Sequence, residues 1–239
     1  MPAAPPKLAK YLANLGYGTR RAVEQLLADG RVTTADGRVL RHGDTAPHDT
    51  LRVDGEPLDP APGRVVMLHK PAGYVSSTRD VGALVYELLP PRFLQRDPVM
   101  ATVGRLDRDT TGLLLLTDDG PLNHRLTSPR HHWPKRYRAS LAEPLRGDEA
   151  AQFASGTFRL EGEPSPLAPA TLEVLSPREV WVTLTEGRYH QVRRMFAACG
   201  NHVVALHREA IGPVTLGELP LGQWRLLTDA ELSALRATP

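Results

Sequence analysis

The hydrophobic residues near the N-terminus follow the spacing of two amphipathic helices. Apolar side chains recur every three or four positions, at Leu8, Leu12 and Leu15 and then at Val23, Leu26 and Leu27. The first helix starts at Lys7, and Gly16 predicts its end. Thr19 predicts the N-cap of the second helix, which ends at Asp29-Gly30. Residues 1–6, MPAAPP, lack this spacing and are expected to form a disordered tail.

Shorter segments with strand character follow. Residues 31–34 and 38–40 flank an Asp36-Gly37 turn and predict a hairpin. A further short strand, residues 51–53, ends at an Asp-Gly turn. The stretch Leu58 to Arg64, LDPAPGR, is rich in Pro and Gly, which is typical of a linker. We therefore expect a small αβ domain over residues 7–58, a linker over 59–64 and a larger domain over 65–239.

The larger domain combines strands with interspersed helices. Apolar runs predict strands at 65–70, 113–117, 136–141, 170–175 and 180–184, and helical spacing predicts helices at 122–127, 148–155 and 190–198. Thr228-Asp-Ala-Glu231 is a capping box and predicts the start of a last helix. Because no regular βαβ period is present, the pattern favours an α+β fold with a mixed, mainly antiparallel sheet and flanking helices.

Charge is unevenly distributed in a chain that is nearly neutral overall. The 239 residues carry a formal net charge of +2. Residues 121–138 nevertheless contain five Lys or Arg, three His and no acid, and residues 187–208 contain four Arg, three His and no acid. Two such segments indicate a basic surface that binds a polyanion, although ordinary solvated faces would give the same pattern.

The single cysteine, Cys199, excludes an intramolecular disulfide and a Cys-x-x-Cys metal site. The chain shows no apolar secretion signal and no apolar run long enough to span a membrane. We therefore expect a cytoplasmic protein.

The strongest chemical signal is the string GRLDRDTTGLLLLTDDG, from Gly104 to Gly120. Its apolar run, residues 113–116, lies between turn residues and predicts a buried strand. Asp107 is therefore expected at the edge of a core, beside arginine side chains, which is a suitable place for a working carboxylate. Two other interpretations are a structural loop whose Asp and Arg residues pair, and a glycosidase that uses Asp107 with Asp109.

This string resembles the active-site motif of the RsuA-type ribosomal RNA pseudouridine synthases, in which the Asp, here Asp107, is the catalytic carboxylate. Residues 135–138, KRYR, resemble the family's Lys-x-Tyr motif, whose Tyr, here Tyr137, stacks on the target base. EGRYHQVRRMF, residues 186–196, resembles the third motif, whose basic residue two places after Gln pairs with the catalytic Asp. That residue is Arg193, with Arg194 as the alternative.

The resemblance extends from Lys7 to Leu235 and implies further roles. Arg105 would insert into the RNA and support the flipped nucleotide, although an ion pair with a neighbouring Asp is an alternative. Leu206 would pack beneath the base. The expected RNA contacts in the basic segments are Lys135, Arg188, His190 and Arg194.

The helices and hairpin of residues 7–58 resemble the S-four-type RNA-binding module. Its expected phosphate contacts are Lys10, Arg20, Arg21 and Arg31. The module usually opens Arg-Leu-Asp-Lys, whereas this chain has Lys-Leu-Ala-Lys at residues 7–10. A structural appendage with no RNA-binding role is the alternative.

Residues 124–132 and 186–208 are most similar to the branch of the family that modifies 16S rRNA. Because isomerising uridine involves no redox change and no group donor, the resemblance implies that no cofactor and no metal are required. We expect a monomer that binds 16S rRNA or an assembling small subunit. A 23S rRNA enzyme of the same family and a non-catalytic ribosome-assembly protein are the alternatives.

Overall fold

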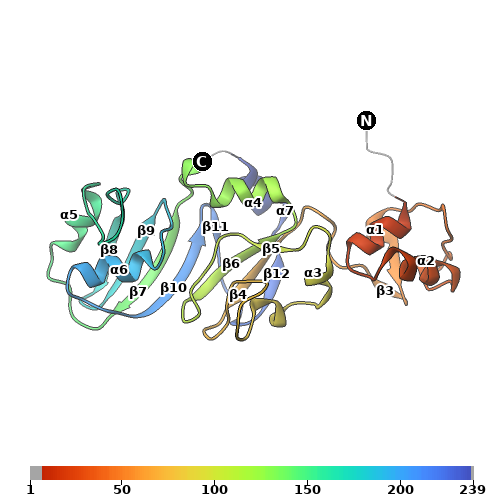
Figure 1. Cartoon of the computed structure of the whole chain (residues 1–239), viewed down its shortest axis with the longest axis horizontal. Helices are drawn as coiled ribbons and strands as arrows, with labels where there is room; N and C mark the ends of the chain where they lie inside the picture. Colours follow the sequence, from red (N-terminus) through yellow and green to blue (C-terminus); the bar gives the residue numbers. More distant parts are fainter. Residues whose placement is uncertain (1–6, 238–239) are drawn as a thin grey trace.

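The structure, a computed structural model, describes residues 7–237, so the tail expected over residues 1–6 lies outside the described part. Two separate sheets organise these residues, one of three strands near the N-terminus and one of nine strands. Figure 1 shows the small N-terminal unit at one end of an elongated molecule, beside helix α3 (Arg92–Gln95).

The N-terminal unit packs two helices against the small sheet. Its elements are α1 (Leu8–Asn14), α2 (Arg20–Ala28), β1 (Val32–Thr34), the 3-10 helix η1 (His48–Thr50), β2 (Leu51–Val53) and β3 (Glu56–Pro57), with antiparallel strands in the order β1-β2-β3. The predicted helical spacing is confirmed, because Leu12 and Leu27 are buried in one core with Val32. Thr19 caps α2 as predicted, since its hydroxyl accepts a hydrogen bond from the Ala22 N–H at 3.2 Å.

The hairpin predicted over residues 31–40 forms only in part. Thr33 and Val39 make an isolated bridge, and the Leu40 N–H donates to the Val32 carbonyl at 2.9 Å. Strand β1 takes β2 as its partner instead, with Val32 opposite Val53. This pairing buries both of those side chains, whereas Val39 is left 42% exposed.

The large sheet is mixed and mainly antiparallel, as predicted. Its strands are β4 (Val65–Lys70), β5 (Ala101–Thr102), β6 (Thr111–Thr117), β7 (Lys135–Leu141), β8 (Thr171–Ser176), β9 (Glu179–Leu184), β10 (Val203–Ile211), β11 (Val214–Thr215) and β12 (Trp224–Leu226). Their order is β12-β4-β6-β10-β7-β9-β8, with β5 beside β6 and β11 beside β10. Over the described residues, β6 and β10 run parallel and the other paired strands run antiparallel.

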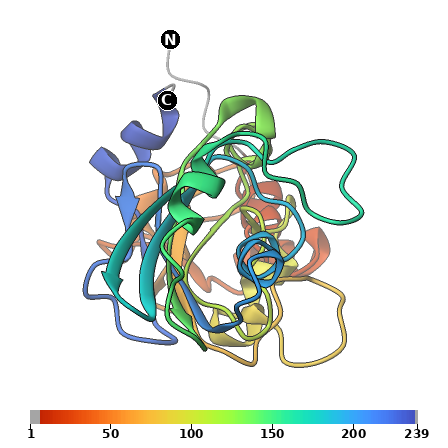
Figure 2. The same cartoon turned by 90° about the vertical axis from the view of Figure 1, so that its left-hand side faces the viewer.

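Helices cover both faces of this sheet. They are the 3-10 helices η2 (Val85–Leu88) and η3 (Pro129–His131), and α3, α4 (Gly120–Thr127), α5 (Glu149–Ala154), α6 (Gln191–Ala198) and α7 (Asp229–Arg236). Successive residues of a strand point to opposite faces, so Met67 packs in the core beneath α4 and α7 while Leu68 packs in the core beneath η2 and α3. Helix α6 packs against β7, β9 and β10, and Figure 2 shows it on the opposite side of the strands from α7.

At the centre of the sheet, β6 and β10 approach each other closely. Gly112 lies opposite Arg208 in the parallel pair and has a φ of +109°. A Cβ atom on Gly112 would lie 2.2 Å from the Arg208 carbonyl oxygen, so glycine is required here for both space and conformation. The loop that precedes β6 is thereby brought to the side chain of Arg208.

Residues 59–64 join the two sheets and are fixed at several points. The Asp59 N–H donates to the Tyr17 hydroxyl at 3.0 Å, and the Asp59 carboxylate pairs with Arg92 of α3. The Gly63 N–H donates to the Asp118 carboxylate at 2.7 Å. These contacts hold the N-terminal unit against the larger part of the chain. Between residues 7 and 237, no helix is long and apolar enough to cross a membrane.

Candidate active site

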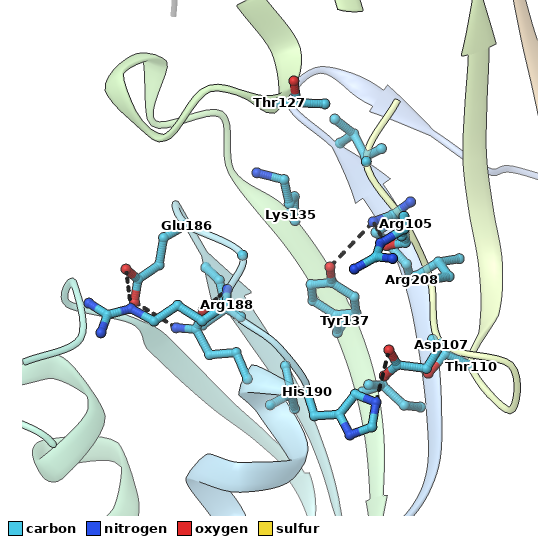
Figure 3. Close-up of a pocket in the computed structure, with 18 of the residues that line it drawn as sticks. Arg105, Asp107, Thr110, Thr127, Lys135, Tyr137, Glu186, Arg188, His190 and Arg208 are labelled. Atoms are coloured by element: carbon cyan, nitrogen blue, oxygen red, sulfur yellow. Dashed lines mark hydrogen bonds and ion pairs between the residues drawn. The ribbon is translucent and has the colours of Figure 1, made fainter. Parts of the chain in front are cut away.

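A pocket of about 490 Å³ opens beside the central strands of the large sheet. Its volume lies within the range of small-molecule sites, roughly 300–1,000 Å³. The lining includes Asp107, Lys135, Tyr137, His190, Leu206 and Arg208. Figure 3 shows the Tyr137 ring between Lys135 on one side and the Asp107–His190 pair on the other. Seven residues predicted from separate parts of the sequence therefore share one cavity with Arg208, since Arg105 and Arg188 line it as well.

Asp107 lies in the loop between β5 and β6. The neighbouring Leu106 and Thr110 are buried and anchor the loop on either side of Asp107. The Ser76 hydroxyl bonds to both the N–H and the carbonyl of Leu106, at 3.3 and 3.2 Å. The carboxylate itself is 31% exposed, and one of its oxygens lies 3.4 Å from Nε2 of His190. The predicted position of Asp107 at the edge of a core is confirmed.

Lys70 holds this loop through hydrogen bonds to its backbone carbonyls. Its side chain is fully buried at the end of β4, and its ammonium donates to the carbonyls of Pro71, Arg108 and Thr110 at 3.0, 3.2 and 2.8 Å. Burial lowers the pKa of Lys70 to about 8, against the attraction of Asp109 and Asp107. Lys70 was not predicted from the sequence, although a lysine that ends an apolar strand was a signal that could have indicated it.

Arg208, on β10, also contacts the backbone of this loop. It is 2% exposed, and its Nε donates to the Leu113 carbonyl at 2.8 Å. Its Nη1 lies 3.4 Å from both the Arg105 carbonyl and the Tyr137 hydroxyl. The guanidinium therefore connects β6, the Asp107 loop and β7. Arg208 was predicted only as one charge of a basic surface, because β10 was not predicted as a strand.

One wall of the pocket comes from β7 and β10. The ring of Tyr137 is half-buried between two cores of the large sheet. Leu206 is 6% exposed and lines the same cavity. Lys135 lies two residues before Tyr137 on the same face of β7, and burial, helped by Arg208, lowers the pKa of Lys135 to about 8. Its ammonium donates to the Trp133 carbonyl at 3.1 Å.

The predicted pairing of Arg193 with Asp107 is wrong in this structure. Nη2 of Arg193 lies 2.8 Å from the Asp109 carboxylate, and its Nη1 donates to the Val203 carbonyl at 2.9 Å. His190 takes the place beside Asp107 instead. The cause lies at the start of α6. His190 is the N-cap of this helix and faces Asp107. Arg193, almost one turn later, lies against β10 and reaches only the carboxylate of Asp109.

Arg188 and Arg194 are ion-paired and do not form a free basic surface. Arg188 pairs with Glu163 at 3.2 Å and with Glu186 at 3.1 Å, and Arg194 pairs with Glu163 at 2.6 Å. The basic surface predicted from this acid-free segment is wrong at these two residues, because Glu163 reaches them from a loop distant in the sequence. Neither Arg194 nor Arg193 pairs with Asp107, so the alternative considered for this pairing is wrong as well.

The remaining predicted RNA contacts differ in their surroundings. Arg105 is exposed and lies at the pocket. In the N-terminal unit, Lys10 and Arg21 are exposed, Arg20 lies 3.5 Å from Glu24, and Arg31 makes two 2.7 Å hydrogen bonds with the Asp54 carboxylate. Because it pairs with Asp54, the side chain of Arg31 is fixed at the Asp54-Gly55 turn.

Comparison with known proteins finds related sequences over almost the whole chain. The sequence profile of the RNA pseudouridylate synthase family matches residues 64–198. The ribosomal small subunit pseudouridine synthase A of Salmonella typhimurium is 45% identical over 235 residues, which cover 96% of this chain and 99% of that protein. The protein of the same name from Escherichia coli K12 is 44% identical with the same coverage. A crystal structure of a pseudouridylate synthase has a TM-score of 0.67 and 39% identity, covering 96% of this chain and 99% of the other.

Proposed function

This chain belongs to the RNA pseudouridylate synthase family, and on that basis we propose that it isomerises one uridine of 16S ribosomal RNA to pseudouridine. Relatives that align with it over nearly their full length carry names that refer to the ribosomal small subunit. A cytoplasmic location follows from this substrate.

The observation that carries the proposal is the Asp107 carboxylate, partly shielded from water in the same pocket as Tyr137. Pseudouridine is an isomer of uridine: the bond from the ribose to the ring nitrogen breaks, and a bond from the ribose to a ring carbon forms. Asp107 either attacks the anomeric carbon or removes the neighbouring ribose proton. Both routes need a carboxylate beside the sugar, and neither needs a co-reactant.

The pocket wall supplies the binding surface for the base. The uracil ring stacks on Tyr137 and packs against Leu206 once the nucleotide has left the RNA helix. Arg105, exposed beside the pocket, supports the flipped conformation by inserting into the RNA. Lys135, which lines the pocket, contacts the RNA backbone.

Arg193 acts on the loop and not on the carboxylate of Asp107. Its guanidinium bridges Asp109 and the Val203 carbonyl, which ties the loop to β10 and α6. Asp109 itself is 68% exposed and outside the pocket lining, which also argues against a glycosidase with two working carboxylates.

The N-terminal unit serves as an S-four-type RNA-binding domain. Its two helices present the exposed Lys10, Arg20 and Arg21, and phosphate contacts from such side chains supply affinity that does not depend on sequence. Contacts to Asp59 and α3 hold the unit next to the catalytic domain, so both parts can bind one RNA.

The proposal is tested by mapping pseudouridines in 16S and 23S rRNA from cells that lack the protein and from the same cells supplied with variants. We expect one 16S site to disappear and to return with the wild-type protein. Asp107→Asn, which keeps size but loses charge, should not restore it, whereas Asp109→Asn should. RNA binding by Asp107→Asn should fall by less than about tenfold, or roughly 1.4 kcal/mol.

Each of the other possible outcomes would overturn a different part of the proposal. Loss of a 23S site would assign the enzyme to the large subunit. A full set of pseudouridines without the protein, together with binding to assembling subunits, would support the non-catalytic alternative. Activity of the Asp107→Asn protein above background would remove Asp107 from the reaction.

A further inference from the structure

Beside the pocket, Tyr189 and His190 present an aromatic surface that the proposed chemistry does not use. Tyr189 is 69% exposed. Its ring stacks on the imidazole of His190, with centroids 3.8 Å apart and planes 17° apart. His190 in turn lies 3.4 Å from the Asp107 carboxylate. His190 therefore lies between the Asp107 carboxylate and the exposed ring of Tyr189.

We propose that Tyr189 is a stacking platform for an unpaired nucleobase adjacent to the target uridine. The inference rests on the proposed function and adds a binding site for a second nucleotide. Flipping one base unstacks its neighbours, and every base has a face that can stack on an aromatic ring. Because Arg188 and His190, on either side of Tyr189, line the pocket, a base on Tyr189 belongs to a nucleotide close to the flipped one.

The backbone around Tyr189 is held in one conformation by the turn before α6. His190 has a left-handed backbone, with φ 47° and ψ 35°, which is unfavourable for a residue with a Cβ atom. The Arg188 N–H donates to the Gln191 side chain at 2.8 Å, and the Arg194 N–H donates to the His190 carbonyl at 2.9 Å. These hydrogen bonds fix both ends of the segment that carries the ring.

The ion pairs of Arg188 and Arg194 support the same segment. Arg194 donates from Nη1 to the Tyr189 carbonyl at 3.3 Å while it pairs with Glu163. Arg188 also binds Glu163 and donates to the Pro166 carbonyl at 2.6 Å. The cations expected to contact RNA instead position the platform, and a ring fixed in advance loses little conformational freedom when a base stacks on it.

The test measures binding of 16S rRNA, as a transcript or a partly assembled subunit, whichever the wild-type protein converts. All proteins for the binding assay carry Asp107→Asn, so the RNA stays unmodified. Tyr189→Ala should raise Kd at least about fivefold. The slope of log Kd against log salt concentration should stay the same, because no phosphate contact is lost. Tyr189→Phe, which keeps the ring, should bind within about twofold of the parent.

Single-turnover rates in the otherwise wild-type protein separate stacking from chemistry. With Tyr189→Ala, the RNA concentration for half-maximal rate should rise at least fivefold, while the rate at saturating RNA falls less than threefold. Val204→Ala is the matched control, because Val204 is 64% exposed on β10 and lies outside the pocket lining.

Unchanged affinity of Tyr189→Ala overturns the platform but leaves the proposed function intact. A flatter salt slope also overturns it, because Tyr189 would then act on a phosphate. A collapse of the saturating rate with unchanged affinity overturns it as well and assigns Tyr189 to the support of His190. If the wild-type protein converts neither form of 16S rRNA, the proposed function fails whatever Tyr189 does.

Discussion

Replacing Lys70 by Met removes a buried ammonium while keeping an unbranched side chain of similar length. In the wild-type protein this ammonium donates to the carbonyls of Pro71, Arg108 and Thr110. The Arg108 carbonyl also accepts from the Gly73 N–H, so the change removes a donor without replacement only from the carbonyls of Pro71 and Thr110. Each carbonyl left without a donor costs about 1–3 kcal/mol. This cost is partly offset by the roughly 3 kcal/mol gained when a charge is no longer buried, so we expect Lys70→Met to be less stable by about 1 kcal/mol at pH 7.

The pH dependence gives the sharper test. Lys70 has a pKa of about 8 in the folded protein against an ordinary value of 10.5. Below pH 8 both the folded and the unfolded chain carry the proton, and the folded state bears the full cost of burying it. Between pH 8 and 10.5 the folded protein releases the proton first, so this cost is relieved as pH rises. The relief amounts to roughly 3 kcal/mol, from about 1.4 kcal/mol per pKa unit.

The assay is chemical denaturation of both proteins from pH 7 to 10.5. The difference in unfolding free energy, wild type minus Lys70→Met, should widen by roughly 3 kcal/mol over this range. Lys135→Met is the matched control, because Lys135 also has a pKa of about 8 but donates to one carbonyl only. Its difference in unfolding free energy should widen by the same amount but start from a lower value at pH 7. Parallel curves for wild type and Lys70→Met would refute the reasoning.

Three further predictions follow from the geometry. Arg193→Met should lower the single-turnover rate by no more than about fivefold, because an ion pair with an exposed carboxylate such as Asp109 contributes little; a hundredfold loss would make Asp107 its partner in the RNA complex. Gly112→Ala should destabilise the protein by at least about 2 kcal/mol in thermal or chemical denaturation, because its Cβ would collide with the Arg208 backbone. Deleting residues 1–58 should raise the RNA concentration for half-maximal rate and flatten its salt dependence, while a folded but wholly inactive product would place the N-terminal unit in the active site.

Local patterns predicted most elements of the fold because their signals lie within a few residues. The helical spacing before Gly16 and the Thr228 capping box correspond to α1 and α7. The strand β10 was not predicted, although it lies at the centre of the sheet. Its pairing with β7 shifts register near Val203 and again near Arg208, and these irregularities interrupt the period of two that identifies a strand.

The candidate site was predictable at Asp107 and Tyr137, where residue type and neighbouring motif agree, and both line the pocket. Side-chain partners were less predictable, since they depend on the reach of flexible chains between elements. Arg193 and Arg194 are adjacent in sequence, yet one reaches Asp109 and the other Glu163. Glu163 lies in a loop for which no contact was expected, so counting charges within a segment overstated its free positive charge.

Under the proposed function, the buried cations hold the Asp107 loop firmly while its carboxylate stays available. Lys70 and Arg208 donate to backbone carbonyls of the loop and of β6, and neither donates to the Asp107 carboxylate. An Arg side chain bonded directly to Asp107 would occupy the oxygens that the proposed reaction uses. Attraction between Lys70 and the carboxylates of Asp107 and Asp109 still acts across the loop. The backbone contacts thus fix the position of the loop, and the positive charge of Lys70 complements the carboxylates. The Asp107 oxygens are then left for the role that we propose for them.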